Sequence, residues 1–388
     1  MNLNRELAGA TLAHLAALEV HHVVVCAGAR NAPLVTSLLA MEGGTGWRVW
    51  NHFDERCAAF FALGLAKKSR KPTAVVTTSG TAVAEMLPAA IEAYYSGIPL
   101  ILVSADRPPA YRGSGAPQAI EQPGIFGPYA PVSVDVQTQT DLSWVLKWSR
   151  MEPLHLNVCF EEPSPQDTVD SFDPVDLPLP KADSDRDEGI SLEAFVANPR
   201  GLVVLIGELE SDWRDPVEMF VAQLGVPVWA EATSGLRESK RLSELLIRQE
   251  RQVAAFEPRE ILRIGGVPSL RFWRDLETQE GIGVMSVTRR PFSGLARLSR
   301  LLVCDRFPTP PEIAQQGQVS DPTLLHSTRF ESGLLNHTGS EPAMMRALSN
   351  LIPSQAMVYL GNSLPIREWN LAASLDRAHP KCYASRGA

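Results

Sequence analysis

The chain has 388 residues, of which 45% are hydrophobic and 21% are charged, and its formal net charge at pH 7 is −8. This composition is typical of a globular protein with two or three domains, and it excludes an intrinsically disordered chain. The negative charge disfavours a general nucleic-acid surface, because phosphate binding requires clustered Lys and Arg side chains.

The first 160 residues alternate short β-branched runs with helical patterns, beginning with an amphipathic helix at the N-terminus. This alternation predicts an α/β domain built on a doubly wound parallel sheet. The expected strands of this domain are 22–26, 74–78, 100–104 and 156–160.

One segment of this domain, 51–85, combines an acid at a predicted helix start with a glycine turn after a strand. Asp54 can cap the helix that Glu55 begins, and Ser79-Gly80-Thr81 leads from the strand into another helix. Such a turn lies at the carboxyl edge of a parallel sheet, where ligands bind. Taken locally, the helix dipole explains the acid equally well, and turn geometry explains the glycine.

The residues 161–187 are dense in Pro and Asp and predict a linker between two domains. A central α/β domain is expected over 188–350. Its expected strands are 201–207, 226–230, 260–264, 283–287 and 301–304.

The remaining segment, 351–388, predicts the start of a third unit. A strand at 357–360 is followed by a Gly-Asn-Ser turn and a helix to about residue 373. This segment is too short for an independent core.

The distribution of cysteine and histidine gives no sign of disulfides or zinc. The five cysteines form no CxxC pair, and the histidines form neither HxxxH nor HExxH, so we expect reduced thiols and no zinc site. The N-terminus lacks the features of a signal peptide, and no apolar run is long enough to span a bilayer. We therefore expect a cytoplasmic protein that is not inserted into a membrane.

Seven motifs in chain order resemble one enzyme family. They are HFDER at 52–56, AAFFALGLAK at 58–67, TTSGTAVAE at 77–85, ILVSADRPP at 101–109, GAPQAIEQPGIFG at 115–127, GNSLPIR at 361–367 and ASRGA at 384–388. The family is 2-succinyl-5-enolpyruvyl-6-hydroxy-3-cyclohexene-1-carboxylate synthase, a thiamine-diphosphate-dependent transferase of menaquinone biosynthesis. The likeness spans the whole chain and is strongest before residue 160 and after residue 358.

The resemblance implies an oligomeric enzyme, a homodimer or tetramer, whose subunits carry three domains. These are a pyrimidine-binding domain (1–160), a central domain (188–350) and a diphosphate-binding domain that starts at 351. It also implies thiamine diphosphate and Mg²⁺ as cofactors. The implied reaction decarboxylates 2-oxoglutarate and adds the resulting four-carbon unit to isochorismate.

The resemblance also implies site residues. Glu55 is expected to share a proton with a ring nitrogen of the cofactor's aminopyrimidine, which makes it the catalytic acid. The implied cofactor-binding positions are Gly28, Glu55, Ser79, Gly80 and Thr81. Both substrates are polycarboxylates, which guanidinium groups can bind through two parallel hydrogen bonds, whereas a single Arg is ordinarily a surface or ion-pair residue. The implied substrate-binding positions are Arg30, Arg107, Gln118, Arg271, Asn362, Ser363, Arg367 and Arg386.

The sequence departs from the family pattern next to these positions. The family usually reads PGSRSxPL where this chain has AGARN at 27–31, so the proline and both serines are replaced. An asparagine at 85, an asparagine at 117 and a basic residue at 270, for which Arg271 is the expected substitute, are replaced as well. The residues found instead are Ala27, Ala29, Asn31, Glu85, Pro117 and Leu270. The changes at 29 and 31 remove a hydroxyl near the expected substrate.

The Gly-Asp-Gly segment that holds Mg²⁺ in these enzymes is missing from the 388 residues. We therefore expect no metal ligands in this chain, and we expect it to be inactive by itself as a truncated synthase. Two alternatives stay open. One is another 2-oxo acid decarboxylating thiamine-diphosphate enzyme, similar to acetolactate synthase, and the other is a noncatalytic remnant or assembly protein.

Overall fold

The structure is a computed structural model that describes residues 2–41, 46–177, 186–187, 191–309, 313, 316–325 and 328–387. The chain divides into two compact units, Met1–Lys181 and Ala182–Gly387. Parts of the predicted linker and of the predicted domain boundary, 178–185 and 188–190, lie outside the described residues. The segment expected to start a third domain belongs to the second compact unit.

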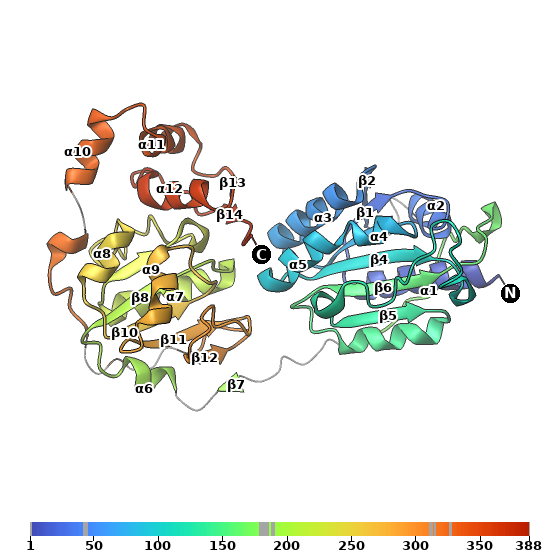
Figure 1. Cartoon of the computed structure of the whole chain (residues 1–388), viewed down its shortest axis with the longest axis horizontal. Coiled ribbons are helices and arrows are strands. Elements are labelled where there is room, and N and C mark those ends of the chain that lie inside the picture. Colours follow the sequence, from blue (N-terminus) through green and yellow to red (C-terminus); the bar gives the residue numbers. More distant parts are fainter. Residues whose placement is uncertain are drawn as a thin grey trace. The chain divides into compact units, whose positions relative to one another are not determined.

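The first unit is built on a six-stranded sheet with the order β2-β1-β3-β4-β6-β5, in which every pair of neighbours is parallel (Figure 1). This confirms the predicted doubly wound parallel sheet. The strands are β1 (His22–Cys26), β2 (Arg48–His52), β3 (Thr73–Thr77), β4 (Leu100–Asp106), β5 (Val132–Val136) and β6 (Leu154–Cys159). The two edge strands, β2 and β5, were not predicted from the sequence.

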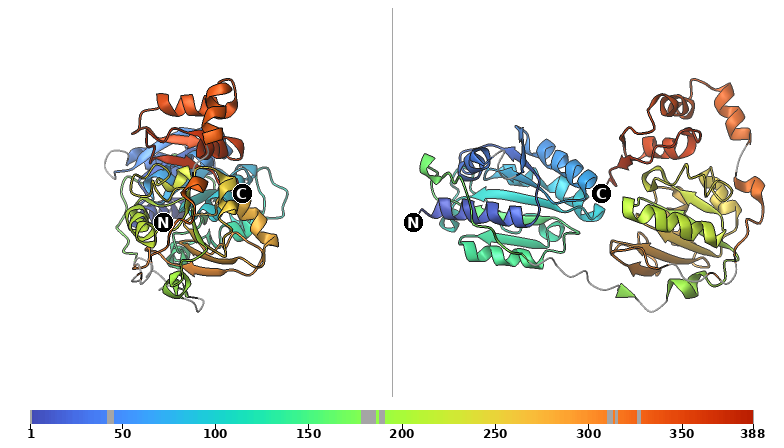
Figure 2. Two further views of the ribbon diagram at one scale, coloured as in Figure 1. Left: turned by 90° about the vertical axis from the view of Figure 1, so that its left-hand side faces the viewer. Right: turned by 180° about the vertical axis from the view of Figure 1, so that it is seen from behind.

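Helices cover both faces of this sheet, because alternate residues of each strand point to opposite faces. Val23 and Val25 of β1 belong to the core under α1, α2 and η3, whereas Val24 belongs to the core under α3 and α5. Figure 2 shows α1, in dark blue, lying along the sheet. The helices are α1 (Leu3–Ala17), α2 (Ala32–Ala40), α3 (Glu55–Ser69), α4 (Thr81–Ala84), α5 (Leu87–Ser96) and the 3-10 helices η1 (Pro109–Tyr111), η2 (Gly127–Tyr129), η3 (Gln139–Lys147) and η4 (Pro165–Asp167).

The strand order of the first sheet reverses between β1 and β3, which creates a topological switch point at their carboxyl ends. The loops after these strands touch each other. A Cβ atom added to Gly28 would lie 2.6 Å from the Cβ of Thr78. A glycine is therefore required at position 28 for the two loops to meet.

We expect Gly28→Ala to destabilise the protein by roughly 1–3 kcal/mol, because the added methyl group overpacks this contact. Gly64, within α3, is the matched control: an added Cβ would meet nothing within 4 Å. Gly64→Ala should stabilise the protein by about 1 kcal/mol, since alanine is the better helix former. Urea unfolding of both variants measures the difference, and equal effects of the same sign would contradict the predicted contact.

The second unit repeats the architecture with the order β7-β12-β11-β10-β8-β9, parallel except for the antiparallel β7. Its order reverses between β8 and β10, where Gly207 lies directly against Gly266. The strands are β7 (Arg186–Asp187), β8 (Leu202–Ile206), β9 (Val228–Ala230), β10 (Glu260–Ile264), β11 (Gly283–Thr288) and β12 (Arg300–Val303). The helices are α6 (Leu192–Val196), α7 (Ser211–Leu224), α8 (Glu250–Ala255), α9 (Arg271–Asp275) and the 3-10 helices η5 (Ala232–Ser234), η6 (Leu276–Thr278) and η7 (Pro322–Leu325).

The C-terminal part of the second unit adds a two-stranded parallel sheet and three helices, namely β13 (Val358–Leu360), β14 (Cys382–Ala384), α10 (Thr328–Asn336), α11 (Glu341–Leu351) and α12 (Leu364–Ala372). Hydrogen bonds join the end of α12 to η5 and to the loop that follows η5. The Ala232 N–H donates to Asn370 Oδ1 at 2.7 Å, and the Arg237 guanidinium donates to the carbonyls of Asn370 and Ala373. Within the described ranges, no helix has the length and apolarity needed to cross a membrane.

Candidate functional site

Glu55 opens α3 at the carboxyl edge of the first sheet. The Cys57 N–H donates to Asp54 Oδ1 at 2.7 Å, so Asp54 caps the helix as predicted, and this bond lowers the pKa of Asp54. Burial, together with the charges of Glu55 and Asp54, raises the pKa of the Cys26 thiol to about 12. The half-buried Glu55 carboxylate thus lies close to the end of β1, and it makes no hydrogen bond or ion pair within the part of the chain that the structure describes.

Asn31 fixes the turn after β1. Its side chain accepts a hydrogen bond from the Gly28 N–H at 2.8 Å and donates one to the Cys26 carbonyl at 2.9 Å, and it is fully buried. The asparagine that stands where the family carries a serine is therefore a structural residue of the turn.

The glycine turn after β3 packs against the loop that carries Gln118. Gly80 has a φ of +84°, and a Cβ there would lie 3.2 Å from the Cα of Gln118, itself at a φ of +57°. Ser79 is buried and Thr81 is exposed. The helix expected from about residue 82 begins at Thr81 as α4 and is interrupted at 85–86 before α5.

A buried glutamine, Gln122, fixes this turn through hydrogen bonds. Its Oε1 accepts the Gly80 N–H at 2.8 Å, and its Nε2 donates to the Ala105 carbonyl at 3.1 Å and to Asn157 Oδ1 at 2.7 Å. Asn157 in turn donates to Asp106 at 3.0 Å and to Asp135 at 2.8 Å. Gln122 was not among the predicted site residues, although it lies four residues after Gln118 in the same motif.

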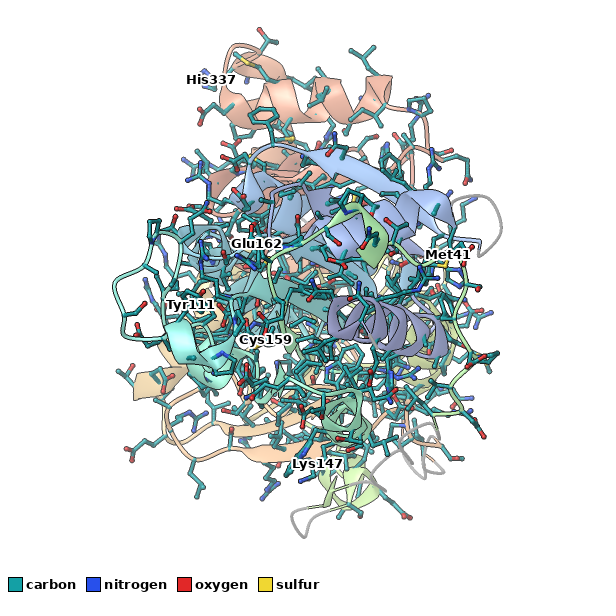
Figure 3. All side chains as sticks on the ribbon, turned by 90° about the vertical axis from the view of Figure 1, so that its right-hand side faces the viewer. Met41, Tyr111, Lys147, Cys159, Glu162 and His337 are labelled. Carbon is teal, nitrogen blue, oxygen red and sulfur yellow. The ribbon has the colours of Figure 1, made fainter. Side chains whose placement is uncertain are left out.

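The acidic groups at the end of this network have metal-like spacing but are held together by one arginine. Ligand atoms of Asp106, Asp135 and Cys159 lie within 4.8 Å of one another. The Arg112 guanidinium donates to them at 3.1, 2.7 and 3.3 Å, and the bond to Asp135 raises the pKa of Arg112. Figure 3 labels Cys159 and Tyr111, the residue before this arginine. We assign the cluster to the stability of the fold.

Arg30 and Arg107 both make contacts within the first unit. Arg30, which is 7% exposed, donates to the carbonyls of Phe160 and Glu161 and pairs with the exposed Glu162 at 2.9 Å. Figure 3 labels Glu162. Arg107 Nε donates to the Pro117 carbonyl at 3.2 Å, so it supports the loop that carries Gln118. These contacts give both arginines structural roles besides the predicted substrate binding.

A cavity of about 370 Å³ lies at the switch point of the second sheet. It gathers four of the predicted substrate residues, which are Arg271, Asn362, Arg367 and Arg386. Ser363, at a φ of +71°, does not line it. In total six arginines and two glutamates line the cavity, the further charged residues being Glu208, Glu231, Arg263, Arg274 and Arg290. This excess of positive charge suits an anionic ligand.

Asn362 joins the two segments that bring the C-terminal arginines to the cavity. Its Nδ2 donates to the Arg386 carbonyl at 3.1 Å, and its Oδ1 accepts the Ser363 N–H at 2.7 Å. The Arg386 guanidinium lies 5.9 Å from the centre of the Phe292 ring. The Gly-Asn-Ser turn therefore positions the backbone of Arg386.

Glu231, after β9, positions the loop that leads to Arg271. Its Oε1 accepts both the N–H and the hydroxyl of Ser269 at 2.6 Å, and it is 3% exposed. Burial raises the pKa of Glu231 to about 7 despite these bonds, with Glu250 and Glu208 adding to the rise. Leu270, the next residue in the loop, is buried in an apolar cluster, so this position contributes packing and no charge. Helical or strand periodicity could not have identified Glu231.

We expect the stability of the protein to fall as the pH rises from about 4.5, the ordinary glutamate value, to about 7, because Glu231 must ionise while buried. Glu231→Gln keeps the acceptor for Ser269 and removes this titration. Relative to the parent chain, the variant should gain roughly 2–3 kcal/mol between pH 4.5 and pH 8. Urea unfolding at several pH values measures this difference, and a difference independent of pH would contradict the assignment.

The chain is similar to several known proteins. The family of the thiamine pyrophosphate enzyme N-terminal TPP binding domain matches residues 5–125. A 2-succinyl-5-enolpyruvyl-6-hydroxy-3-cyclohexene-1-carboxylate synthase of Akkermansia muciniphila is 41% identical over 94% of this chain and 69% of its own length. The same-named protein of Bdellovibrio bacteriovorus is 38% identical over 99% of this chain and 75% of its length.

A solved structure supports the architecture. Benzoylformate decarboxylase from Polynucleobacter necessarius superposes with a TM-score of 0.66, covering 99% of this chain and 74% of that chain at 18% identity. This likeness concerns the fold, whereas the relatives above share the sequence itself. The chain therefore belongs to the 2-succinyl-5-enolpyruvyl-6-hydroxy-3-cyclohexene-1-carboxylate synthase family of thiamine pyrophosphate enzymes.

Proposed function

We propose that the chain supplies the pyrimidine-binding and substrate-binding parts of a transferase that decarboxylates 2-oxoglutarate and adds the four-carbon unit to isochorismate. The observation that carries this proposal is the cavity of the second unit, where Arg271, Arg367, Arg386 and Asn362 meet. Guanidinium groups bind carboxylates through paired, charge-assisted hydrogen bonds, and both substrates carry more than one carboxylate. The proposal includes three domains, with the third beginning near residue 351.

The first unit fits the aminopyrimidine end of thiamine diphosphate. When bound, this cofactor supplies a nucleophilic carbon and an electron sink for decarboxylation. The partly exposed Glu55 carboxylate can hold a proton at a ring nitrogen of the pyrimidine. Gly28 and Gly80 lie in the two loops that meet at the same switch point, and Ser79 and Thr81 flank the second glycine.

The chain does not show a fit for Mg²⁺ and the diphosphate group. Magnesium requires oxygen ligands in near-octahedral geometry and usually keeps several waters. In the described part of the chain, the one grouping of three acidic or thiol ligands is held by Arg112. We therefore place the diphosphate and the metal on residues beyond those described, and we expect no submicromolar binding of thiamine diphosphate and Mg²⁺ by this chain alone.

A second copy of the chain is part of the proposal. Phe53, two residues before Glu55, is 99% exposed, and Phe60 on α3 is 39% exposed. Aromatic side chains exposed beside a functional site are typical of a surface that another subunit covers. We propose a homo-oligomer in the cytoplasm, where the free thiols of the chain would stay reduced.

The test joins this chain to the part of the Akkermansia relative that the match does not cover. With thiamine diphosphate and Mg²⁺, the chimaera should consume 2-oxoglutarate only slowly alone and rapidly with isochorismate. Mass spectrometry of the product identifies the transferred four-carbon unit. Preference for pyruvate would favour an acetolactate-synthase-like activity, and a correctly folded chimaera without turnover on either acid would favour a noncatalytic role.

A further inference from the structure

Arg263 of β10 is the most deeply buried cation of the second unit's cavity, with 1% of its surface exposed. Its Nε donates to Ser286 Oγ at 2.9 Å, and its Nη2 donates to the Phe292 carbonyl at 2.7 Å. The guanidinium also lies 5.5 Å from the centre of the Trp273 ring. Among the residues that the structure describes, Arg263 has no carboxylate partner, and its Nη1 makes no hydrogen bond.

The charges that act most strongly on Arg263 are of the same sign. Burial, together with the charges of Arg386 and Arg290, lowers the pKa of Arg263 to about 9, so the group remains protonated at pH 7. Arg290 differs from it, since Arg290 pairs with Glu210 at 3.2 Å and lies 3.9 Å from Glu208. A buried charge without a counter-ion is costly, and an anion bound in the cavity would compensate it.

We propose that Arg263, on β10 of the second sheet, is a specificity-determining residue that binds a carboxylate of the ligand in this cavity. The free Nη1 supplies donors, and the two bonds to Ser286 and Phe292 hold the guanidinium plane in place. The identity of the ligand, 2-oxoglutarate or isochorismate, rests on the proposed function. The inference that Arg263 binds an anionic group does not depend on the proposed function, because it follows from the buried guanidinium without a carboxylate partner.

A purely structural role is the competing explanation, because the bond to Phe292 also supports the loop after β11. The two roles predict different effects of the Arg263→Lys and Arg263→Gln substitutions on ligand binding. A lysine at 263 keeps the charge but loses the planar fork, so ligand binding should be partly retained. A glutamine keeps a donor but loses the charge, so ligand binding should be weakened most.

Calorimetric titration of the full chain with 2-oxoglutarate, and separately with isochorismate, tests the proposal. For at least one of the two ligands, we expect Arg263→Gln to weaken binding by at least about 10-fold and Arg263→Lys to weaken it by less. The matched control is Arg241→Gln, which removes an exposed arginine that lies outside the cavity and 4.0 Å from Glu218. This control should change the affinity by less than about 2-fold.

The proposal would be overturned by unchanged affinity in Arg263→Gln, by equal losses in Arg263→Gln and Arg241→Gln, or by no binding of either ligand to the parent chain. Equal losses in Arg263→Gln and Arg263→Lys, with the amide resonances of 289–294 shifted alike, would show a structural role and also overturn it. Arg263-dependent binding in a chimaera without turnover would contradict the proposed function and leave this assignment standing.

Discussion

Glu55→Gln in the chimaera is expected to lower turnover with 2-oxoglutarate and isochorismate by at least about 100-fold, the lower end of the usual contribution of a positioned acid. Glutamine has the shape of glutamate but cannot share the proton of a ring nitrogen. Steady-state kinetics at saturating cofactor measure the loss. The unfolding free energy should change by less than about 1 kcal/mol, because Glu55 has no described partner and only favours the start of α3.

The control for this variant is Glu85→Gln, which removes an exposed acid in the segment after the glycine turn. It should change turnover by less than about 2-fold, as an exposed charge away from the chemistry usually does. Near-normal turnover in Glu55→Gln would contradict the catalytic assignment. Equal losses in both variants would point to the overall charge at this edge of the sheet rather than to one carboxylate.

Gln122→Leu is expected to destabilise the first unit by roughly 2–4 kcal/mol, because it leaves several buried polar groups without partners. The groups are the Gly80 N–H, the Ala105 carbonyl and Asn157 Oδ1. Urea unfolding followed by far-UV circular dichroism measures the loss. Gln118→Leu, at an exposed position of the same loop, should change stability by less than about 0.5 kcal/mol.

A second variant separates the two ends of the Gln122 side chain. Gln122→Glu keeps the acceptor for the Gly80 N–H, but as a carboxylate it cannot donate to Ala105 or Asn157. Its stability loss should therefore persist at pH 8 and diminish at low pH, where the protonated acid can donate again. A loss in Gln122→Leu no greater than that in Gln118→Leu would mean that Gln122 does not hold the turn.

The strands at the centres of both sheets could be predicted because runs of buried β-branched residues between turn residues carry a local signal. β1 and β10 lie where they were expected. β2 was missed because it is an edge strand with no fully buried residue, so its sequence lacks an apolar run. β5 alternates apolar and polar residues in VSVDV, a signal that was present and not used.

The sequence by itself determined the fold class, the helix start at Glu55 and the loops that carry the candidate site residues, since all these depend on local patterns and on the shared edge of parallel strands. The tertiary structure alone decided which polar groups find partners. Arg30 meets the carbonyl of Glu161, 131 residues away, and Arg263 meets that of Phe292, yet Arg263 finds no acid among the described residues. Such pairings arise from the packing of distant segments, for which local periodicity carries no signal.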